Sequence, residues 1–316
     1  MVEKKICAIV LNYNGYSDTI KCVDSIINSE VFPEIVVVVD NCSIDESILE
    51  LKKYFSSVRA SFVDFSFFEY LSYKDACDEI GRHGVRPVIV LLGSSHNGGY
   101  ASGNNLGLSL AMELGVDACW ILNNDTVVSQ TALKSMCARL FSSPDEKVGL
   151  CGSLVCYADG SDRVQCCGGG HTNIWTGLSV LAGHMMPRGH AQSVPARDVE
   201  KELNFIYGAS VMVSRSFLEE VGLMDERFFL YCEEQDWAWR GFKHGFRLGY
   251  APDAVVYHSE GATTGMNQRS RTLRRMLQLT RSRILLAAKH KPLAMFTVVV
   301  SCAFAALRLA FRSRRG

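Results

Sequence analysis

The sequence has no acidic residue after Glu260, no pair of CxxC motifs and no long apolar run near its start. Most of the twelve cysteines stand singly in apolar segments. The adjacent Cys166 and Cys167 suit neither a zinc ligand pair nor an easy disulfide. Charged residues precede a short first strand, so no signal peptide is expected. These absences disfavour a disulfide-stabilised secreted domain and predict free thiols in a reducing cytosol.

The net charge of zero hides an uneven distribution of charge along the chain. The last 56 residues carry twelve Lys and Arg and no Asp or Glu, whereas the first 260 residues carry 21 basic and 33 acidic residues. Such an acidic body with a basic tail predicts an anionic partner for the tail. The 316 residues, 48% of them hydrophobic, suffice for one large domain or two small ones.

Apolar runs alternate with helix-like segments in the first half of the chain. The runs KICAIVL, EIVVVV and VIVLL, and the start of ACWILNNDTVV, have the composition of strands buried on both faces. The alternation predicts an α/β fold with a parallel sheet and right-handed crossovers. Residues 59–86 break the rhythm and are interpreted as an insertion. The Gly-rich residues 158–200 show little periodicity, which is typical of a lid or binding loop.

Polar residues follow three of these strands. Asn12 and Tyr13 follow the first, Asp40 ends the second, and Asn123, Asn124 and Asp125 end the ACWILNNDTVV strand. Strand ends of a parallel sheet share one edge, where nucleotides bind. Asp40 is placed to accept a hydrogen bond from a base imide or a ribose hydroxyl. Asp125, together with the carboxamides of Asn123 and Asn124, suits a divalent cation that also takes phosphate oxygens. An Asn-capped turn is the simpler alternative.

Two further segments carry residues of catalytic type. HNGGYASGNN is a Gly/Asn loop; it lacks the GxGxxG spacing and the later acidic residue of a dinucleotide dehydrogenase. Glu233, Glu234 and Asp236 lie beside aromatic residues, where a carboxylate gains basicity and can act as a general base. The alternative is that these acids only complement a helix dipole. His258 ends a strand and is either a structural histidine or a second metal ligand.

Taken together, four segments make the chain resemble glycosyltransferase family 2, the inverting GT-A transferases, and its bacterial rhamnosyltransferase-like branch. They are IVLNYNGYSDTIKCVDSI, VVVDNCSIDES, HNGGYASGNNLGL with ILNNDTVV, and GASVMVSRSFLEEVGLMDERFFLYCEEQDWAWR ending in VVYHSEG. The resemblance implies a GT-A-like fold over residues 1–265. It implies nucleoside contacts at Tyr13 and Asp40, donor-side contacts at Asn97, Gly98 and Asn104, a metal at Asp125 and His258, and a base at Glu234, near Asp236. Two departures are Asn123, where the family has the first acid of its metal motif, and Glu234, where it usually has Asp.

The implied reaction is direct displacement at the anomeric carbon of a UDP- or dTDP-linked sugar, assisted by Mn²⁺ or Mg²⁺, with a lipid-linked or growing surface glycan as acceptor and no nucleic acid partner. Rhamnose or another hexose would be the transferred sugar. A catalytically inactive sugar-nucleotide or glycan-binding protein is the alternative. A nucleotidyltransferase is less favoured because the early Gly-rich loop with Lys or Arg is absent.

The tail, residues 266–316, predicts a basic helix over 269–291 and an apolar segment over 293–307. The apolar segment is shorter than the roughly twenty residues that a membrane span needs. We therefore expect a helix that lies on an anionic membrane, which would make the protein peripheral on the cytoplasmic side of the inner membrane. The alternative is a helix docked on the body or on a second subunit of a homodimer.

Overall fold

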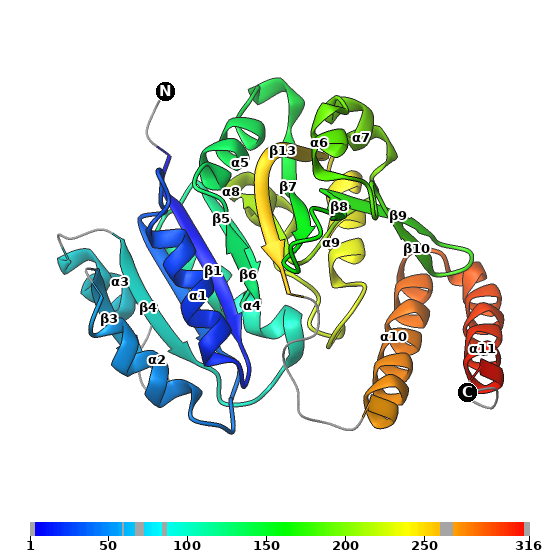
Figure 1. The fold of residues 1–316 in the computed structure, drawn as a ribbon, viewed down its shortest axis with the longest axis horizontal. Coiled ribbons are helices and arrows are strands. Elements are labelled where there is room, and N and C mark those ends of the chain that lie inside the picture. The colour runs from blue at the N-terminus through cyan, green and yellow to red at the C-terminus, as the bar shows by residue number, and fades with distance from the viewer. Residues whose placement is uncertain (1–3, 59, 67–72, 84–86, 260–267, 313–316) are drawn as a thin grey trace.

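The computed structural model describes residues 4–58, 60–66, 73–83, 87–259 and 268–312. Within them, a ten-stranded sheet runs in the order β3-β4-β2-β1-β5-β12-β7-β13-β6, with β8 paired to β7 (Figure 1). Its strands are β1 (Ile6–Asn12), β2 (Ile35–Asp40), β3 (Ser61–Phe65), β4 (Val88–Gly93), β5 (Ala118–Asn123), β6 (Thr126–Val128), β7 (Val148–Tyr157), β8 (Val164–Cys167), β12 (Ser210–Ser214) and β13 (Arg247–His258). The predicted α/β class with a mostly parallel sheet is confirmed.

The central parallel strands bring the predicted strand ends to one edge. β1 pairs with β2 on one side and with β5 on the other, so that Asn12 lies opposite Asp40 and Leu11 lies opposite Asn123. All six residues of β2 are buried, as expected of an apolar run with helices on both faces.

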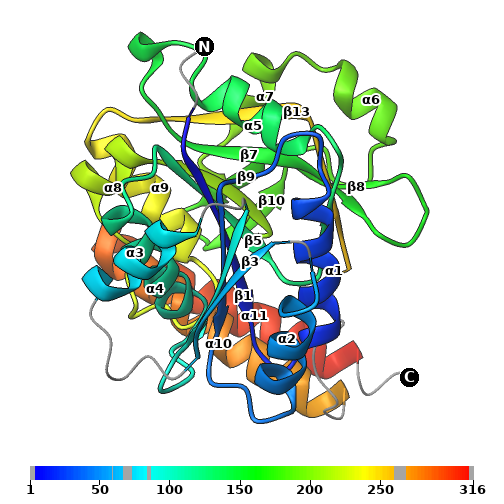
Figure 2. The same cartoon turned by 90° about the vertical axis from the view of Figure 1, so that its left-hand side faces the viewer.

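Helices cover both faces of the sheet (Figure 2). Alternate β1 residues divide between the two layers: Ile9 packs in the core with α3, α4, α8 and α9, and Val10 packs in the core with α1, α2 and α5. The helix bounds are α1 (Tyr16–Ile27), α2 (Ser47–Phe55), α3 (Tyr73–Arg82), α4 (Gly99–Glu113), α5 (Ala132–Leu140), α6 (Arg188–Ser193), α7 (Ala196–Glu202), α8 (Arg215–Val221) and α9 (Glu233–Lys243).

Two of the segments interpreted as irregular have regular structure. In residues 59–86, β3 extends the parallel sheet beside β4 and α3 packs against it; residues 59, 67–72 and 84–86 lie outside the described part. Residues 158–200 contain β8, α6 and α7 together with β9 (Gly169–Asn173) and β10 (Leu178–Leu181), and β9 joins β10 and β11 (Phe205–Ile206) in a small antiparallel sheet. The expectation of a long loop without secondary structure was therefore wrong, because short strands of mixed composition lack a clear period-2 signal.

The tail forms two helices, α10 (Gln268–His290) and α11 (Met295–Arg312), joined by a single 3-10 turn over Pro292–Ala294. They pack on each other at the end of the molecule beside β9 and β10 (Figure 1). No helix in the described part of the chain is both long and apolar enough to cross a membrane. The expected domain boundary at residues 265 and 266 falls outside the described residues.

Candidate active site

Asn12 and Asp40 form a buried hydrogen-bonded unit with Ser43. The Asn12 amide donates to Asp40 Oδ1 at 2.7 Å, and Ser43 donates to Asp40 through its hydroxyl at 2.6 Å and its backbone N–H at 2.9 Å. Asn12 and Asp40 have no exposed surface. In this conformation they shape the turn after β2 rather than present a face to a ligand. Tyr13 follows directly and is partly exposed.

The turn after β5 places Asp125 against His258, although the two residues are 133 positions apart. His258 Nε2 lies 3.1 Å from Asp125 Oδ1 and 3.5 Å from the Asn123 amide nitrogen. The Asn124 amide donates to Gly15 O and to Thr19 Oγ1, each at 3.2 Å, and so ties this turn to α1. The predicted pair of metal ligands is therefore brought together.

Gln165, on β8, fixes the orientation of the His258 ring. Its amide nitrogen donates to the His258 carbonyl at 3.2 Å, which leaves its Oε1 2.8 Å from His258 Nδ1. The Nδ1 proton therefore points to Gln165, and Nε2 faces Asp125. A lone pair and a carboxylate oxygen at 3.1 Å repel each other unless a proton or a metal cation lies between them. This donor set fits a divalent cation, and the remaining coordination positions are then left for a ligand.

The donor-side residues lie at the start of α4. Asn97 Oδ1 accepts the Gly99 N–H at 3.0 Å and the Asn41 amide at 3.1 Å. Gly98 is the residue that precedes the helix. Asn104 is buried and donates to Tyr100 O at 3.0 Å, so it supports the helix from within. The expected Gly/Asn loop HNGGYASGNN is therefore mostly helix, because α4 begins at Gly99, within this segment.

Glu234 fits against Gly208, the first residue of the GASVMV segment, to which the sequence assigned no role. A methyl group on Gly208 would overlap Glu234 Oε1, so a larger residue there would push the carboxylate out of its position. The Tyr100 hydroxyl donates to Gly208 O at 2.6 Å and so lies at the same place in the site. Burial raises the pKa of Glu234 to about 7. Burial, together with the charge of Glu234, also raises the pKa of its fully enclosed neighbour Glu233 well above the usual value. Glu234 therefore has the basicity of a general base at neutral pH.

Three consecutive residues join the base side to the metal side. Gly208 contacts Glu234, the preceding Tyr207 packs edge-on to His258 with ring centroids 6.1 Å apart, and the following Ala209 carbonyl accepts the Asn123 N–H at 3.1 Å. The two groups of predicted residues therefore contact the same short segment.

Asp236 points to another part of the molecule. It is fully buried, and its carboxylate pairs with Arg240 at 2.9 Å, Lys289 at 2.7 Å and His290 at 2.7 Å. Burial alone would raise the pKa of Asp236, but the hydrogen bonds from His290 and Lys289 outweigh it and lower the pKa. These contacts favour a structural role over the predicted catalytic one.

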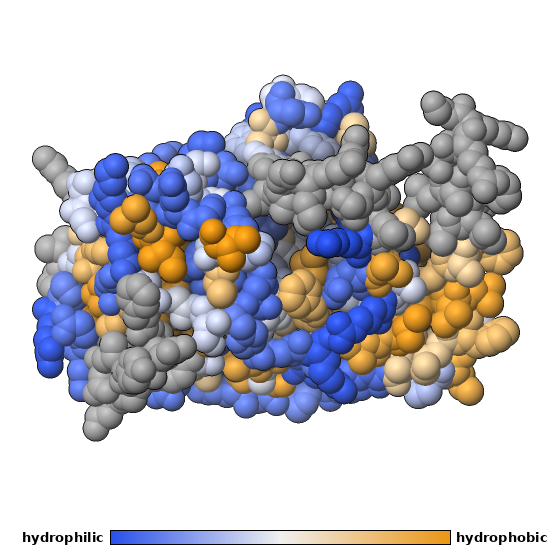
Figure 3. Space-filling model, turned by 90° about the horizontal axis from the view of Figure 1, so that it is seen from below, coloured by the Kyte–Doolittle hydropathy of each residue, from blue (hydrophilic) through white to orange (hydrophobic). Residues whose placement is uncertain are grey.

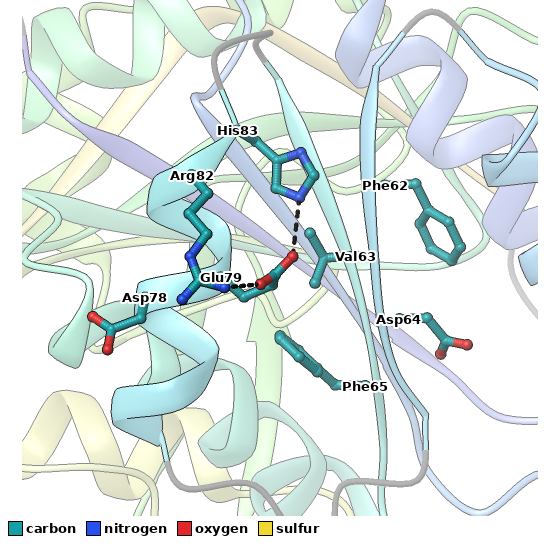
Figure 4. Close-up of a pocket in the computed structure, with 8 residues that line it drawn as sticks. All are labelled: Phe62, Val63, Asp64, Phe65, Asp78, Glu79, Arg82 and His83. Carbon is teal, nitrogen blue, oxygen red and sulfur yellow. Dashed lines mark hydrogen bonds and ion pairs between the residues drawn. The ribbon is translucent and has the colours of Figure 1, made fainter.

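The structure adds Gln165, Tyr100 and Gly208 to the site. Tyr100 and Gly208 lie in two of the segments that carry the resemblance, HNGGYASGNN and GASVMV, but the sequence assigned them no role, and Gln165 lies in none of the four segments. In the described residues no group of three or more His, Cys, Asp or Glu side chains gathers as a metal cluster. A separate cavity between β3 and α3 (Figure 4) shares no residue with this site and lies at the opposite edge of the sheet from β13. It is lined by Phe62, Val63, Asp64, Phe65, Asp78, Glu79, Arg82 and His83.

The parallel strand ends, the Asp125–His258 pair and the partly buried Glu234 carboxylate give this protein the organisation of a GT-A-type sugar transferase. Residues 120–313, more than half of the chain, match the sequence model of Glycosyl transferase family group 2. The chain belongs to this family, and the predicted resemblance is confirmed.

Curated relatives match over shorter stretches. The chain is 35% identical over 71 residues to an N-acetylglucosaminyl-diphospho-decaprenol L-rhamnosyltransferase of Mycobacterium tuberculosis, which covers 22% of this chain and 23% of that protein. It is 22% identical over 171 residues to the low-salt glycan biosynthesis hexosyltransferase Agl10 of Haloferax volcanii, which covers 53% of this chain and 50% of that protein. The chain thus spans about a quarter of the length of the mycobacterial relative and half of the length of Agl10.

Two solved structures share the fold. GalNAc-T7 with UDP, GalNAc and Mn²⁺ superposes with a TM-score of 0.58 at 14% identity, over 90% of this chain and 48% of that chain. The mannosyltransferase PcManGT from Pyrobaculum calidifontis, in complex with GDP-Man and Mn²⁺, superposes with a TM-score of 0.55 at 15% identity, over 97% and 76% of the two chains. These likenesses confirm the GT-A-like fold.

Proposed function

We propose that the protein is an inverting glycosyltransferase that moves a hexose from a nucleotide-diphosphate sugar to a hydroxyl of a lipid-linked or growing glycan. The observation that carries the proposal is that Glu234, His258 and the turn that bears Asp125 all contact the Tyr207–Ala209 segment. In the proposed reaction the base acts on the acceptor hydroxyl, and the cation held by the Asp125–His258 pair acts on the diphosphate of the donor.

Glu234 is the proposed general base. It takes the proton of the acceptor hydroxyl while the hydroxyl oxygen forms a bond to the anomeric carbon, and the bond from that carbon to the diphosphate breaks on the opposite face. A pKa of about 7 leaves the carboxylate both sufficiently ionised and sufficiently basic at neutral pH. Gly208 lies against the carboxylate, and the Tyr100 hydroxyl fixes the Gly208 carbonyl; a defined position of the base is what such an in-line attack requires.

Asp125 and His258 Nε2 are the proposed ligands of Mn²⁺ or Mg²⁺. A bound cation would stabilise negative charge on the leaving diphosphate. Gln165 contributes by keeping Nε2 directed at Asp125. UDP or dTDP is the proposed nucleotide, and rhamnose is a candidate sugar, supported by the partial match to the mycobacterial rhamnosyltransferase.

Glu234→Gln tests the catalytic part of the proposal. Glutamine keeps the shape of the side chain but cannot take the proton, so we expect release of UDP or dTDP in the presence of donor and acceptor to fall about a hundredfold or more. Donor binding, measured by calorimetry, should stay within about twofold. Glu202→Gln, at an exposed site on α7, is the matched control. Normal turnover in Glu234→Gln would remove the base, and a wild-type protein that binds donor but never releases nucleotide would favour the inactive binding protein.

The tail is the proposed contact with an anionic membrane. α11 and the turn before it expose Leu293, Phe296 and Phe304 at 81, 76 and 64% of their surface. The apolar surface at the α11 end of the molecule, with hydrophilic surface beside it, is visible in Figure 3. A membrane is favoured over a second subunit because the tail has twelve cationic residues and no acidic ones, which suits anionic headgroups. The protein would then be peripheral to the cytoplasmic face of the inner membrane.

Sedimentation with vesicles tests this contact. The double variant Phe296→Ser/Phe304→Ser should lose most of its binding to vesicles with anionic lipid, because each serine removes the apolar area of one aromatic side chain from the bilayer interface. Leu49→Ser, which is 65% exposed on α2, is the control. Unchanged sedimentation of the double variant would contradict the membrane role, and a change in oligomeric state by gel filtration would point to a dimer interface instead.

A further inference from the structure

One face of α10 contacts the loop that leads into the base. Ser282, Leu286, Lys289 and His290 follow one another at intervals of four, three and one residues, which places them on one side of a helix. All four contact the stretch from Asp225 to Asp236. That stretch contains Glu234 and the loop that leads to it.

Lys289 joins the two ends of this stretch. Its ammonium lies 2.6 Å from Asp225 Oδ2 and 2.7 Å from Asp236 Oδ1, and His290 adds a second contact to Asp236 at 2.7 Å. Arg227 pairs with Asp225 from within the loop at 2.6 Å. One residue of the tail therefore holds the beginning of the loop and the first turn of α9 at the same time.

α10 also contacts the middle of the loop. The Ser282 hydroxyl donates to Leu230 O at 2.8 Å, and the buried Leu286 packs against Phe228 and Cys232. Tyr231 and Cys232 both have φ of 70°, in the left-handed region that residues with a side chain rarely adopt. Such a conformation persists only where the surrounding contacts hold it. Here those contacts include α10.

The other side of the loop reaches the donor side of the site. Phe229 O accepts the Tyr100 N–H at 2.8 Å, and Gly99, with φ of 85°, lets this carbonyl approach because any side chain there would collide with it. Tyr100 in turn donates to the Gly208 carbonyl beside Glu234. A shift of the loop would therefore displace the surroundings of the base.

We propose that α10 is a positioning element for Glu234, and that Lys289 and Ser282 are its positioning residues because they hold the loop from Asp225 to Asp236 in a conformation it would not keep alone. The proposal rests on the proposed function through the role of Glu234. Neither Lys289 nor Ser282 touches the reacting atoms, so their effect is on the geometry of the base and not on nucleotide binding.

Two measurements on Lys289→Met and Ser282→Ala test the proposal, with Arg281→Met, exposed on the same helix, as the control. We expect Lys289→Met to lower kcat at least about tenfold while KM for the donor stays within about twofold, because a displaced base affects the chemical step alone. Lys289→Arg, which keeps the charge, should recover part of kcat. Amide hydrogen exchange of residues 228–236 should be faster in both test variants and unchanged in the control.

The outcomes separate the two proposals. If the wild type turns over donor and Lys289→Met retains full kcat, or if exchange of the loop is unchanged in both variants, the positioning role of α10 is overturned while the transferase stands. If the wild type releases no nucleotide, the proposed function falls and the positioning role falls with it. If Lys289→Met does not fold, the gentler Ser282→Ala decides by the same two readouts.

Discussion

Gly208→Ala is the sharpest test of the site, because it adds one methyl group at the carboxylate of the base. The backbone of Gly208 does not require a positive φ, so alanine is compatible with the chain conformation there. The methyl group would nevertheless overlap Glu234 Oε1. A relaxed contact between carbon and oxygen needs about 3.3 Å, so the carboxylate would have to move by roughly 1 Å.

A displacement of about 1 Å at a reacting group can cost on the order of a hundredfold in rate. We therefore expect kcat of Gly208→Ala to fall by about that factor, measured as nucleotide release at saturating donor and acceptor. Calorimetric binding of UDP with Mn²⁺ should change little, because Asp125 and His258 are not displaced. Gly81→Ala is the control, since nothing lies within 4 Å of the added methyl group. Full kcat in a folded Gly208→Ala protein would refute the assignment of Glu234 as a general base that is positioned against Gly208.

Three further outcomes follow from the electrostatics and the metal side. Because Glu234 acts only when ionised and its pKa is about 7, kcat/KM should rise about tenfold per pH unit up to that pH and then level off; a flat profile from pH 5.5 to 8 would contradict this. Gln165→Leu should weaken Mn²⁺ binding in the presence of UDP about 10- to 100-fold by calorimetry, because His258 loses its orienting partner, and unchanged affinity would refute that role. In Asp125→Ala, UDP binding should no longer depend on Mn²⁺; a persistent dependence would place the cation elsewhere.

The strands that carry the site could be predicted because each apolar run is long enough to indicate a strand buried on both faces. β1, β2 and β5 are buried on both faces, and their polar ends at Asn12, Asp40 and Asn123 then had to share an edge. The start of α4 could not be read in the same way. Glycine and asparagine disfavour a helix, yet Gly107 lets α4 approach Ile9 on β1 where a methyl group would collide. Tertiary packing overrides the local preference there.

The remaining parts of the site depend on contacts between residues far apart in sequence. Gln165 meets His258 across 93 positions and Tyr100 meets Gly208 across 108, and neither pair has a recognisable spacing. For Asp236, the missing long-range contacts led the sequence analysis to predict a role that the structure does not favour. An acid at the head of a helix beside the base suggests catalysis, but its partners Lys289 and His290, more than fifty residues later, show that it anchors the tail.

Because α10 anchors the body and α11 carries the exposed apolar face, two truncations of the tail should behave differently. A chain ending at residue 291 loses α11 but keeps Lys289 and His290. A chain ending at residue 266 also loses Lys289 and His290, two of the three partners of Asp236, whose side chain is fully buried. Losing two charge-assisted hydrogen bonds there costs about 3 kcal/mol. The shorter chain should therefore unfold on the order of 5–10 °C lower than the chain ending at residue 291.

Both truncated chains should lose vesicle binding. Equal unfolding temperatures in a thermal scan would show that the contacts of α10 do not stabilise the body, and the tail would then be an independent unit.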